Sequence, residues 1–161
     1  MIKSAFWAFC VLLFIACKKT NTSAGIQYKV NGVPVQITGG RDTAITDPVT
    51  GYNYGCYGTK PGGSNFYTID GEDANNRIQM VIATSQSGLL TTTYTDGVVE
   101  IVTTYQDTTY GSGMNNGSAS ITISSFSNGI VSGTFTATVL DTNANVKTIT
   151  QGQFNNIRVY P

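Results

Sequence analysis

A two-residue alternation of apolar and hydroxyl side chains constrains the fold of this chain more than any other feature of its sequence. Residues 118–124 read SASITIS, and residues 131–139 read VSGTFTATV. Because successive side chains of a β-strand point to opposite faces of the sheet, each run predicts a strand with one apolar and one hydroxyl-rich face. The side chains expected in the core are Ala119, Ile121, Ile123, Val131, Phe135, Ala137 and Val139, with Gly133 on the same face, and from a third run Ile78, Met80 and Ile82.

Turn residues separate these runs, and no window shows an apolar stripe of helical period. Three Asn-Gly or Asp-Gly pairs predict tight type I′ hairpin turns, because these residues accept the positive φ angles that such a turn needs. They are Asn31-Gly32, Asp96-Gly97 and Asn128-Gly129. Two long polar segments, 39–51 and 106–117, are expected to be loops.

About ten strands are expected from the alternation and the turns. They lie near residues 26–30, 33–38, 52–58, 64–69, 77–84, 89–95, 98–105, 118–125, 130–140 and 146–159. The last is expected to break at Gly152 and to continue as a separate return strand. The predicted fold is therefore all-β, as a single antiparallel β-sandwich or a meander-type barrel.

The composition excludes several classes of function. The chain has no histidine, which removes Ser-His-Asp and Cys-His catalysis and most zinc sites. Lys and Arg number 9, and Asp and Glu also number 9, so there is no excess of positive charge for binding nucleic acid. We expect neither catalytic residues nor a cofactor. Cys56 is expected to be the one cysteine of the folded domain, so no disulfide within the domain is expected.

The first residues have the pattern of an export signal. Lys3 precedes an apolar run over residues 5–16, which is too short for a membrane-spanning helix of about 20 residues. The run ends in Ala16 followed by Cys17. A small residue directly before a cysteine at this point resembles the lipobox of bacterial lipoproteins. Phe14 stands where the commonest pattern has leucine, and such looser forms resemble those of Bacteroidota.

The resemblance implies that the chain is cut after Ala16 and that Cys17 is acylated at its thiol and at its new amine. It divides the chain into a signal peptide over 1–16, a lipidated cysteine with a flexible tether over 17–25, and an all-β domain over 26–161. Two or more acyl chains attach a protein stably to a membrane, whereas one holds only marginally. The expected location is the outer membrane, and the lack of acidic residues directly after the lipidated cysteine favours its periplasmic face over the cell surface.

Three motifs of the predicted domain resemble a group of small Bacteroidota lipoproteins of unknown function. They are YKVNGVPV over residues 28–35, VSGTF over 131–135 and ITQGQF over 149–154. The resemblance implies location and fold but no activity. Within the strands themselves, Gly133 and Gly152 predict β-bulges or close approaches of another element. Phe154, in the apolar part of the last run, is expected in the core.

One acidic cluster is a candidate calcium site. Asp70, Glu72 and Asp73 lie close together in the sequence with Asn75 and Asn76, and Ca²⁺ takes about six to eight oxygen ligands. The same segment joins two predicted strands and consists of typical turn residues. We therefore prefer a solvated hairpin turn to a metal site.

Several tyrosines are candidates for a ligand-binding platform. Tyr52, Tyr57, Tyr105 and Tyr110 combine apolar area with a polar tip, which suits sugar rings or peptides. Tyrosine is also a favoured strand residue. We therefore prefer an arrangement in which Tyr52, Tyr54 and Cys56 alternate into the core while Tyr57 covers an edge.

Two threonines are candidate modification sites. Thr43 and Thr108 each follow an aspartate in one of the two predicted loops. Their surroundings resemble the Asp-Ser/Thr-apolar sites of O-glycosylation in Bacteroidota. This resemblance concerns modification and implies no activity.

The expected function is that of a non-enzymatic lipoprotein of the cell envelope, either structural or binding. The membrane is the expected partner of its lipid anchor, with an envelope protein or a glycan as a further partner. A carbohydrate-binding accessory lipoprotein is the main alternative. A hydrolase that uses Asp or Glu is a distant alternative, because the acids are few and most lie in predicted turns.

Overall fold

The chain folds into β-strands, and the predicted all-β class is confirmed. The computed structural model describes residues 23–40, 55–62, 64–85, 88–113 and 116–161, and no helix lies within these ranges. The strands are β1 (Gly25–Val30), β2 (Val33–Thr38), β3 (Gly55–Thr59), β4 (Phe66–Glu72), β5 (Asn76–Ala83), β6 (Thr93–Thr95), β7 (Val99–Tyr105), β8 (Thr108–Gly111), β9 (Ser118–Ser127), β10 (Ile130–Leu140) and β11 (Val146–Tyr160).

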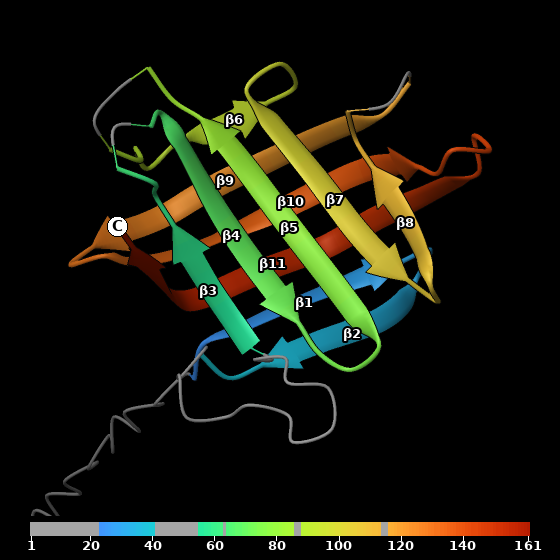
Figure 1. Cartoon of the computed structure of the whole chain (residues 1–161), viewed down its shortest axis with the longest axis horizontal. Helices are drawn as coiled ribbons and strands as arrows, with labels where there is room; N and C mark the ends of the chain where they lie inside the picture. Colours follow the sequence, from blue (N-terminus) through green and yellow to red (C-terminus); the bar gives the residue numbers. More distant parts are fainter. Residues whose placement is uncertain (1–22, 41–54, 63, 86–87, 114–115) are drawn as a thin grey trace, which may run out of the picture.

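The strands form two layers that are joined at two corners. Hydrogen-bonded neighbours follow the order β2-β1-β11-β3-β4-β5-β7-β8-β10-β9-β6, and β10 also pairs with β11. Figure 1 shows β3, β4, β5, β7 and β8 crossing over the other six strands. We call these five strands the front layer and β6, β9, β10, β11, β1 and β2 the back layer. At the corners β11 pairs with β3 only through its last two residues, and β10 pairs with β8 only at Leu140.

One pair of strands departs from the predicted antiparallel arrangement. The end of β11 runs parallel to β3, with Val159 opposite Gly58, whereas every other pair of named strands is antiparallel. Strands so far apart in the sequence are not joined by a hairpin, so nothing in the connection requires them to run in opposite directions. The short contacts at both corners give a sandwich rather than a regular barrel.

The core lies between the two layers and contains the residues that the alternation predicts. Phe135 is 2% exposed and Phe154 is fully buried. The predicted residues of β5, β9 and β10 are buried as well, while the residues that alternate with them are half-buried or exposed. Burial of apolar surface stabilises a fold by about 25 cal/mol per Å², and it is the main favourable term that holds such layers together.

Two of the three predicted hairpin turns are confirmed. Asn31 and Gly32 have φ angles of 47° and 84°, and they join β1 to β2 with Val30 opposite Val33. The Asn128-Gly129 pair joins β9 to β10 with positive φ angles in the same way. Positive φ at both central positions is the signature of the type I′ turn, whose twist matches that of the strands.

The third predicted hairpin is wrong. A tight turn does form at Asp96-Gly97, with the Val98 N–H donating to the Thr95 carbonyl oxygen at 3.2 Å. However, β6 pairs with β9 in the back layer, and β7 pairs with β5 and β8 in the front layer. The turn therefore carries the chain from one layer to the other.

The loop predicted over 106–117 is also partly wrong, because its first half contains strand β8. Gln106 and Asp107 have φ angles of 49° and 59° and form a tight turn that places Tyr105 opposite Thr108. Neither residue is a glycine, so the usual signal of a type I′ turn is missing from the sequence.

The predicted break at Gly152 does not occur. Strand β11 continues from Val146 to Tyr160 and pairs with β10 along its length. The register shifts twice, so two residues of β11 oppose one of β10 between Ile149 and Gly152 and again between Phe154 and Ile157. These are β-bulges, which bend and twist a strand without ending it.

Candidate functional site

The outer face of the back layer carries a straight row of uncharged polar side chains. Each strand of this layer contributes one residue, and each residue is the register partner of the next. In order from β6 through β9, β10, β11 and β1 to β2, the row consists of Thr93, Thr122, Thr134, Gln153, Gln27 and Gln36. We call these six residues the polar row.

Side-chain hydrogen bonds hold the row at two places. The hydroxyl oxygens of Thr93 and Thr122 lie 2.8 Å apart, and Gln27 Nε2 donates to Gln153 Oε1 at 3.0 Å. Between these two pairs, Thr134 makes no side-chain hydrogen bond with the described residues. Its exposed hydroxyl is therefore available to a ligand at the centre of the row.

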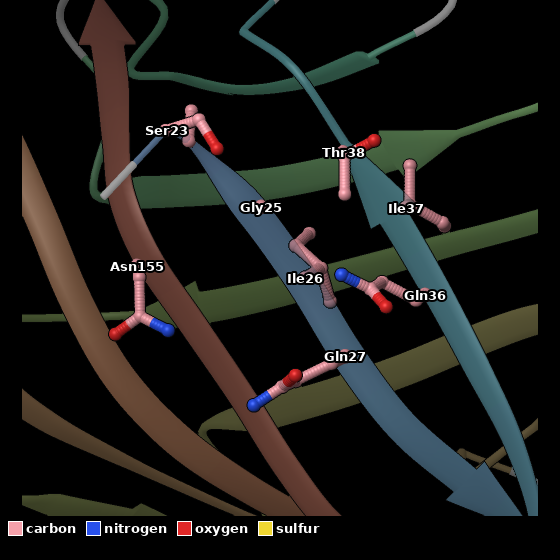
Figure 2. Close-up of a pocket in the computed structure, with 9 residues that line it drawn as sticks. Ser23, Gly25, Ile26, Gln27, Gln36, Ile37, Thr38 and Asn155 are labelled. Carbon is pink, nitrogen blue, oxygen red and sulfur yellow. The ribbon is translucent and has the colours of Figure 1, made fainter. Parts of the chain in front are cut away.

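Two hollows lie along the polar row. The larger, of about 370 Å³, is lined by Thr122, Thr134 and Gln153 of the row and by Gln151. The smaller, of about 240 Å³, is lined by residues from β1, β2 and β11. Figure 2 shows the side chains of Gln27, Gln36 and Asn155 around it. The hydrogen bond between Gln27 and Gln153 links a lining residue of the smaller hollow to a lining residue of the larger one.

The bulges of β11 add polar groups to this face. Gln151 and Asn156 each have a φ angle of 53°, which is uncommon for residues other than glycine. Gln151 lines the larger hollow, and the neighbouring Asn155 lines the smaller one. The Asn156 N–H donates to Ser132 Oγ at 2.9 Å, which anchors the second bulge to β10. Bulges commonly re-aim side chains near binding and active sites.

The chemistry of this face is that of hydroxyls and amides. The residues that line the two hollows have no titratable side chain. Threonine hydroxyls and glutamine amides both donate and accept hydrogen bonds, so they can match the hydroxyl groups of a neutral polar ligand. They offer no fixed charge to a phosphate or to a carboxylate.

The acidic cluster lies at the hairpin that joins β4 to β5. The Asp73 carboxylate accepts hydrogen bonds at 2.8 Å from the backbone N–H groups of Asn75 and Asn76, which fixes the turn between β4 and β5. Asp70 is buried within β4 and accepts a bond from Gln79 Nε2 at 2.8 Å. Among the described residues, no group of three or more His, Cys, Asp or Glu side chains is placed to hold a metal ion.

The predicted tyrosine platform is not assembled by the described residues. Tyr57 lies on the outer face of the front layer, in one register row with Asp70. Tyr110 is only 7% exposed, belongs to the core and has Lys147 Nζ at 5.8 Å from its ring centre. Tyr105 also packs against the core. Tyr52 falls outside the described residues.

The predicted lipidation site and one of the two predicted glycosylation sites fall outside the described residues. Cys17 and Thr43 fall outside the described residues, and Thr108 is a half-buried residue at the start of β8. Cys56 is a free, buried cysteine whose Sγ donates to the Ile37 carbonyl oxygen at 3.5 Å. Burial raises the pKa of its thiol to about 12.

Sequence reasoning identified the hydroxyl faces of single strands but missed the row that they form together. It did predict a bulge or a close approach at Gly133 and at Gly152, and each glycine adjoins one of the two register shifts between β10 and β11. The inward-facing residues of β11 are Ile149, Gly152, Phe154 and Ile157. The three-residue steps before Gly152 and after Phe154 depart from strict alternation, and each step marks a bulge.

The function has to be inferred from the fold and from the geometry of the polar row. No helix in the part of the chain that the structure describes is long and apolar enough to cross a membrane. Comparison of the chain with known protein families, with curated proteins and with solved structures finds no match.

Proposed function

We propose that this protein is a non-enzymatic binding domain of the bacterial cell envelope that recognises a neutral glycan through the polar row. The observation that carries the proposal is the alignment of six uncharged polar residues, one from each strand of the back layer, beside two hollows. Lipid on Cys17 would hold the domain at the outer membrane.

The dimensions of the row suit an extended polymer. Five spacings between neighbouring strands, at about 4.8 Å each, give a row of about 24 Å. A ligand that lies along the row would meet hydroxyl groups at the threonine end and amide groups at the glutamine end. A chain of sugar rings presents hydroxyl groups at regular intervals, so it can pair with both ends of the row.

The absence of charge along the hollows favours a neutral glycan over an anionic one. Binding of a polyanion depends on neutralising several charges and weakens steeply with salt. Uncharged hydrogen-bonding groups carry no such dependence, because salt screens interactions between charges. The affinity for a neutral glycan should therefore change little with ionic strength.

The short length of the proposed tether is consistent with a ligand that lies in the cell envelope. Residues 18–25 span at most about 26–29 Å when fully extended. A domain that begins at Gly25 would thus stay close to the membrane that holds Cys17.

The experiment is affinity electrophoresis of the chain from residue 17 onward, with Cys17→Ser, through gels that contain neutral or anionic polysaccharides. We expect retardation by at least one neutral polysaccharide, unchanged between about 0.05 and 0.5 M salt because no charge pair contributes. Retardation by anionic polysaccharides alone, with loss at high salt, would reject a neutral ligand. Retardation by none of a broad set of envelope polysaccharides would reject the proposed function.

A further inference from the structure

The outer face of the front layer has a different character from the polar row. Phe66 is 52% exposed and Val98 is 43% exposed, although both are large apolar side chains. They lie on either side of Ala83, which is the register partner of Phe66 and whose N–H donates to the Val98 carbonyl oxygen at 2.7 Å. We call Phe66, Val81, Ala83 and Val98 the apolar patch.

A hollow of about 450 Å³ adjoins the apolar patch and is larger than either hollow on the polar row. All four residues of the patch line it, together with the two acidic residues Asp96 and Glu100. No basic residue is among the described residues that line this hollow. It therefore combines exposed apolar surface with negative charge, which no hollow on the polar row does.

The Glu100 carboxylate is available to a partner. Glu100 is exposed, and it makes no hydrogen bond or ion pair within the described part of the chain. A Cβ atom added to Gly113 would lie only 2.7 Å from Glu100 Oε1, so the carboxylate rests against the bare backbone at the edge of the hollow. Val81 is the register partner of Glu100, which places an aliphatic group directly beside the charge.

The apolar patch lies far from the point where the tether enters the domain. In Figure 1 the start of β1 is at the lower end of the molecule, whereas the start of β4, the end of β5 and the start of β7 are at the upper end. The patch occupies these upper strand ends, with Val98 directly before the start of β7. It therefore lies at the opposite end of the front layer from the start of β1.

We propose that the apolar patch and Glu100 form a docking site for an envelope protein, whose contacting segment carries an aliphatic side chain next to a lysine or arginine. The aliphatic group would bury Phe66 and Val98, and the cation would pair with Glu100. This site is separate from the polar row and does not depend on the glycan proposal.

Charge argues against the two other occupants of such a patch. In a symmetric dimer the same patch meets itself, so Glu100 and Asp96 of one copy would face acids of the other without a basic residue between them. A membrane surface rich in anionic lipid would be repelled by the same two carboxylates. A basic and apolar protein segment satisfies both features of the site.

The experiment uses the chain from residue 17 onward with Cys17→Ser and three pentapeptides blocked at both ends. The probes are Lys-Val-Lys-Val-Lys, Glu-Val-Glu-Val-Glu and Ser-Val-Ser-Val-Ser, and binding is followed by NMR titration. We expect the basic peptide to bind most tightly and to shift the resonances of the patch. Its affinity should fall as salt rises, because the pair with Glu100 is exposed.

Two variants and a control test the residues directly. Phe66→Ser should weaken binding of the basic peptide by about tenfold, as the loss of a central aromatic anchor does. Glu100→Gln should weaken it by about threefold, as expected for one exposed ion pair. Val33→Ser removes a side chain of similar exposure on β2 and should leave binding unchanged.

Several results would overturn the proposal. One is equal binding of the three peptides, and another is affinity for the basic peptide that survives both Phe66→Ser and Glu100→Gln. Sedimentation that shows a dimer, abolished by Phe66→Ser, would assign the patch to a second copy of the chain instead. Binding to phosphatidylethanolamine vesicles that is lost in Phe66→Ser would assign it to a membrane. Circular dichroism of each variant checks that it is folded.

Discussion

The ring of Phe154 lies directly against Gly133, its register partner on the neighbouring strand. An added Cβ atom at Gly133 would be 2.5 Å from Cζ of Phe154. The same arrangement occurs with the strands exchanged. The Phe135 ring of β10 covers Gly152 of β11, and a Cβ atom added to Gly152 would lie 2.7 Å from Phe135 Cδ2. The two rings stack with their centres 6.3 Å apart. Each glycine therefore supplies the space for a phenylalanine of the adjacent strand.

Gly133→Val should destabilise the domain because the branched side chain would collide with the backbone carbonyl oxygen of Thr122 and with the Phe154 ring. Overpacking of a filled core typically costs about 1–3 kcal/mol. The change is measured as a shift in the urea unfolding midpoint at an unchanged slope. A variant as stable as the parent chain would show that the space beside Gly133 is not filled, and the described packing of these strands would be incorrect.

Phe135→Ala should cost more, about 3–5 kcal/mol, through lost transfer free energy and the cavity left behind. Thr136→Ala on the outer face of the same strand is the matched control and should change stability by no more than about 0.5 kcal/mol. If both variants unfold at the same lowered urea concentration, the inward and outward faces of β10 have been assigned the wrong way round.

Cys56 should be inert to thiol reagents in the folded protein. Burial raises the pKa of this thiol to about 12, so almost none of the reactive thiolate is present at pH 8. Labelling with a chromogenic disulfide should be slow in buffer and rapid in concentrated urea, with a midpoint that follows unfolding. Rapid labelling without urea would contradict the burial. Reductant should leave the unfolding midpoint of the Cys17→Ser chain unchanged.

Asp141 should contribute stability at neutral pH that is lost in acid. Hydrogen bonds from the Asn145 side chain, and then from the backbone N–H groups of Asn145 and Asn143, hold the pKa of its carboxyl below the usual range. A carboxyl whose folded pKa is lowered stabilises the folded state above its unfolded pKa of about 3.9. That contribution disappears as the pH falls through the lowered folded value.

The variant Asp141→Asn isolates this contribution. Parent and variant should differ in urea midpoint at pH 7, and the difference should shrink as the pH is lowered below about 4, where the parent carboxyl takes up a proton. A difference that stays constant from pH 7 to the acid limit would show that the charge of Asp141 has no part in it.

Cys17→Ser should release the protein from membranes. The proposed lipid on Cys17 is the predicted attachment point, and several acyl chains are needed for stable anchoring. The measurement is fractionation of cells that express either form, followed by a high-salt wash of the membranes. A variant that remains in the washed membrane pellet would contradict the predicted anchor.

Local sequence signals predicted the parts of the fold that depend on local physics. The alternation around Phe135 and Ile121 identifies the buried faces because side-chain direction in a strand is set residue by residue. Asn31-Gly32 identifies a turn because its positive φ angles are a property of those two residues. Each of these features is encoded within a few positions.

The features that the sequence did not reveal depend on partners far along the chain. The turn at Asp96-Gly97 is visible in the sequence, but its local signal does not say that β6 joins β9 while β7 joins β5. The polar row also depends on distant partners. Thr134 lies beside Gln153, and Gln153 beside Gln27, only when three strands that are distant in the sequence pair in one register. Register among distant strands is set by the packing of the whole core.

Paired isosteric variants test most directly whether the polar row binds a neutral glycan. Thr134→Val and Gln153→Leu remove hydrogen-bonding groups at the middle of the row while keeping the shape of the side chains. Thr109→Val removes an exposed threonine hydroxyl from β8 in the front layer and serves as the control. With the neutral polysaccharide that retards the parent chain most, each variant of the row should weaken binding by about fivefold or more, for a lost hydrogen bond of about 1 kcal/mol. The control should bind like the parent. Equal affinity in all four proteins would contradict the assignment of the polar row as the binding site.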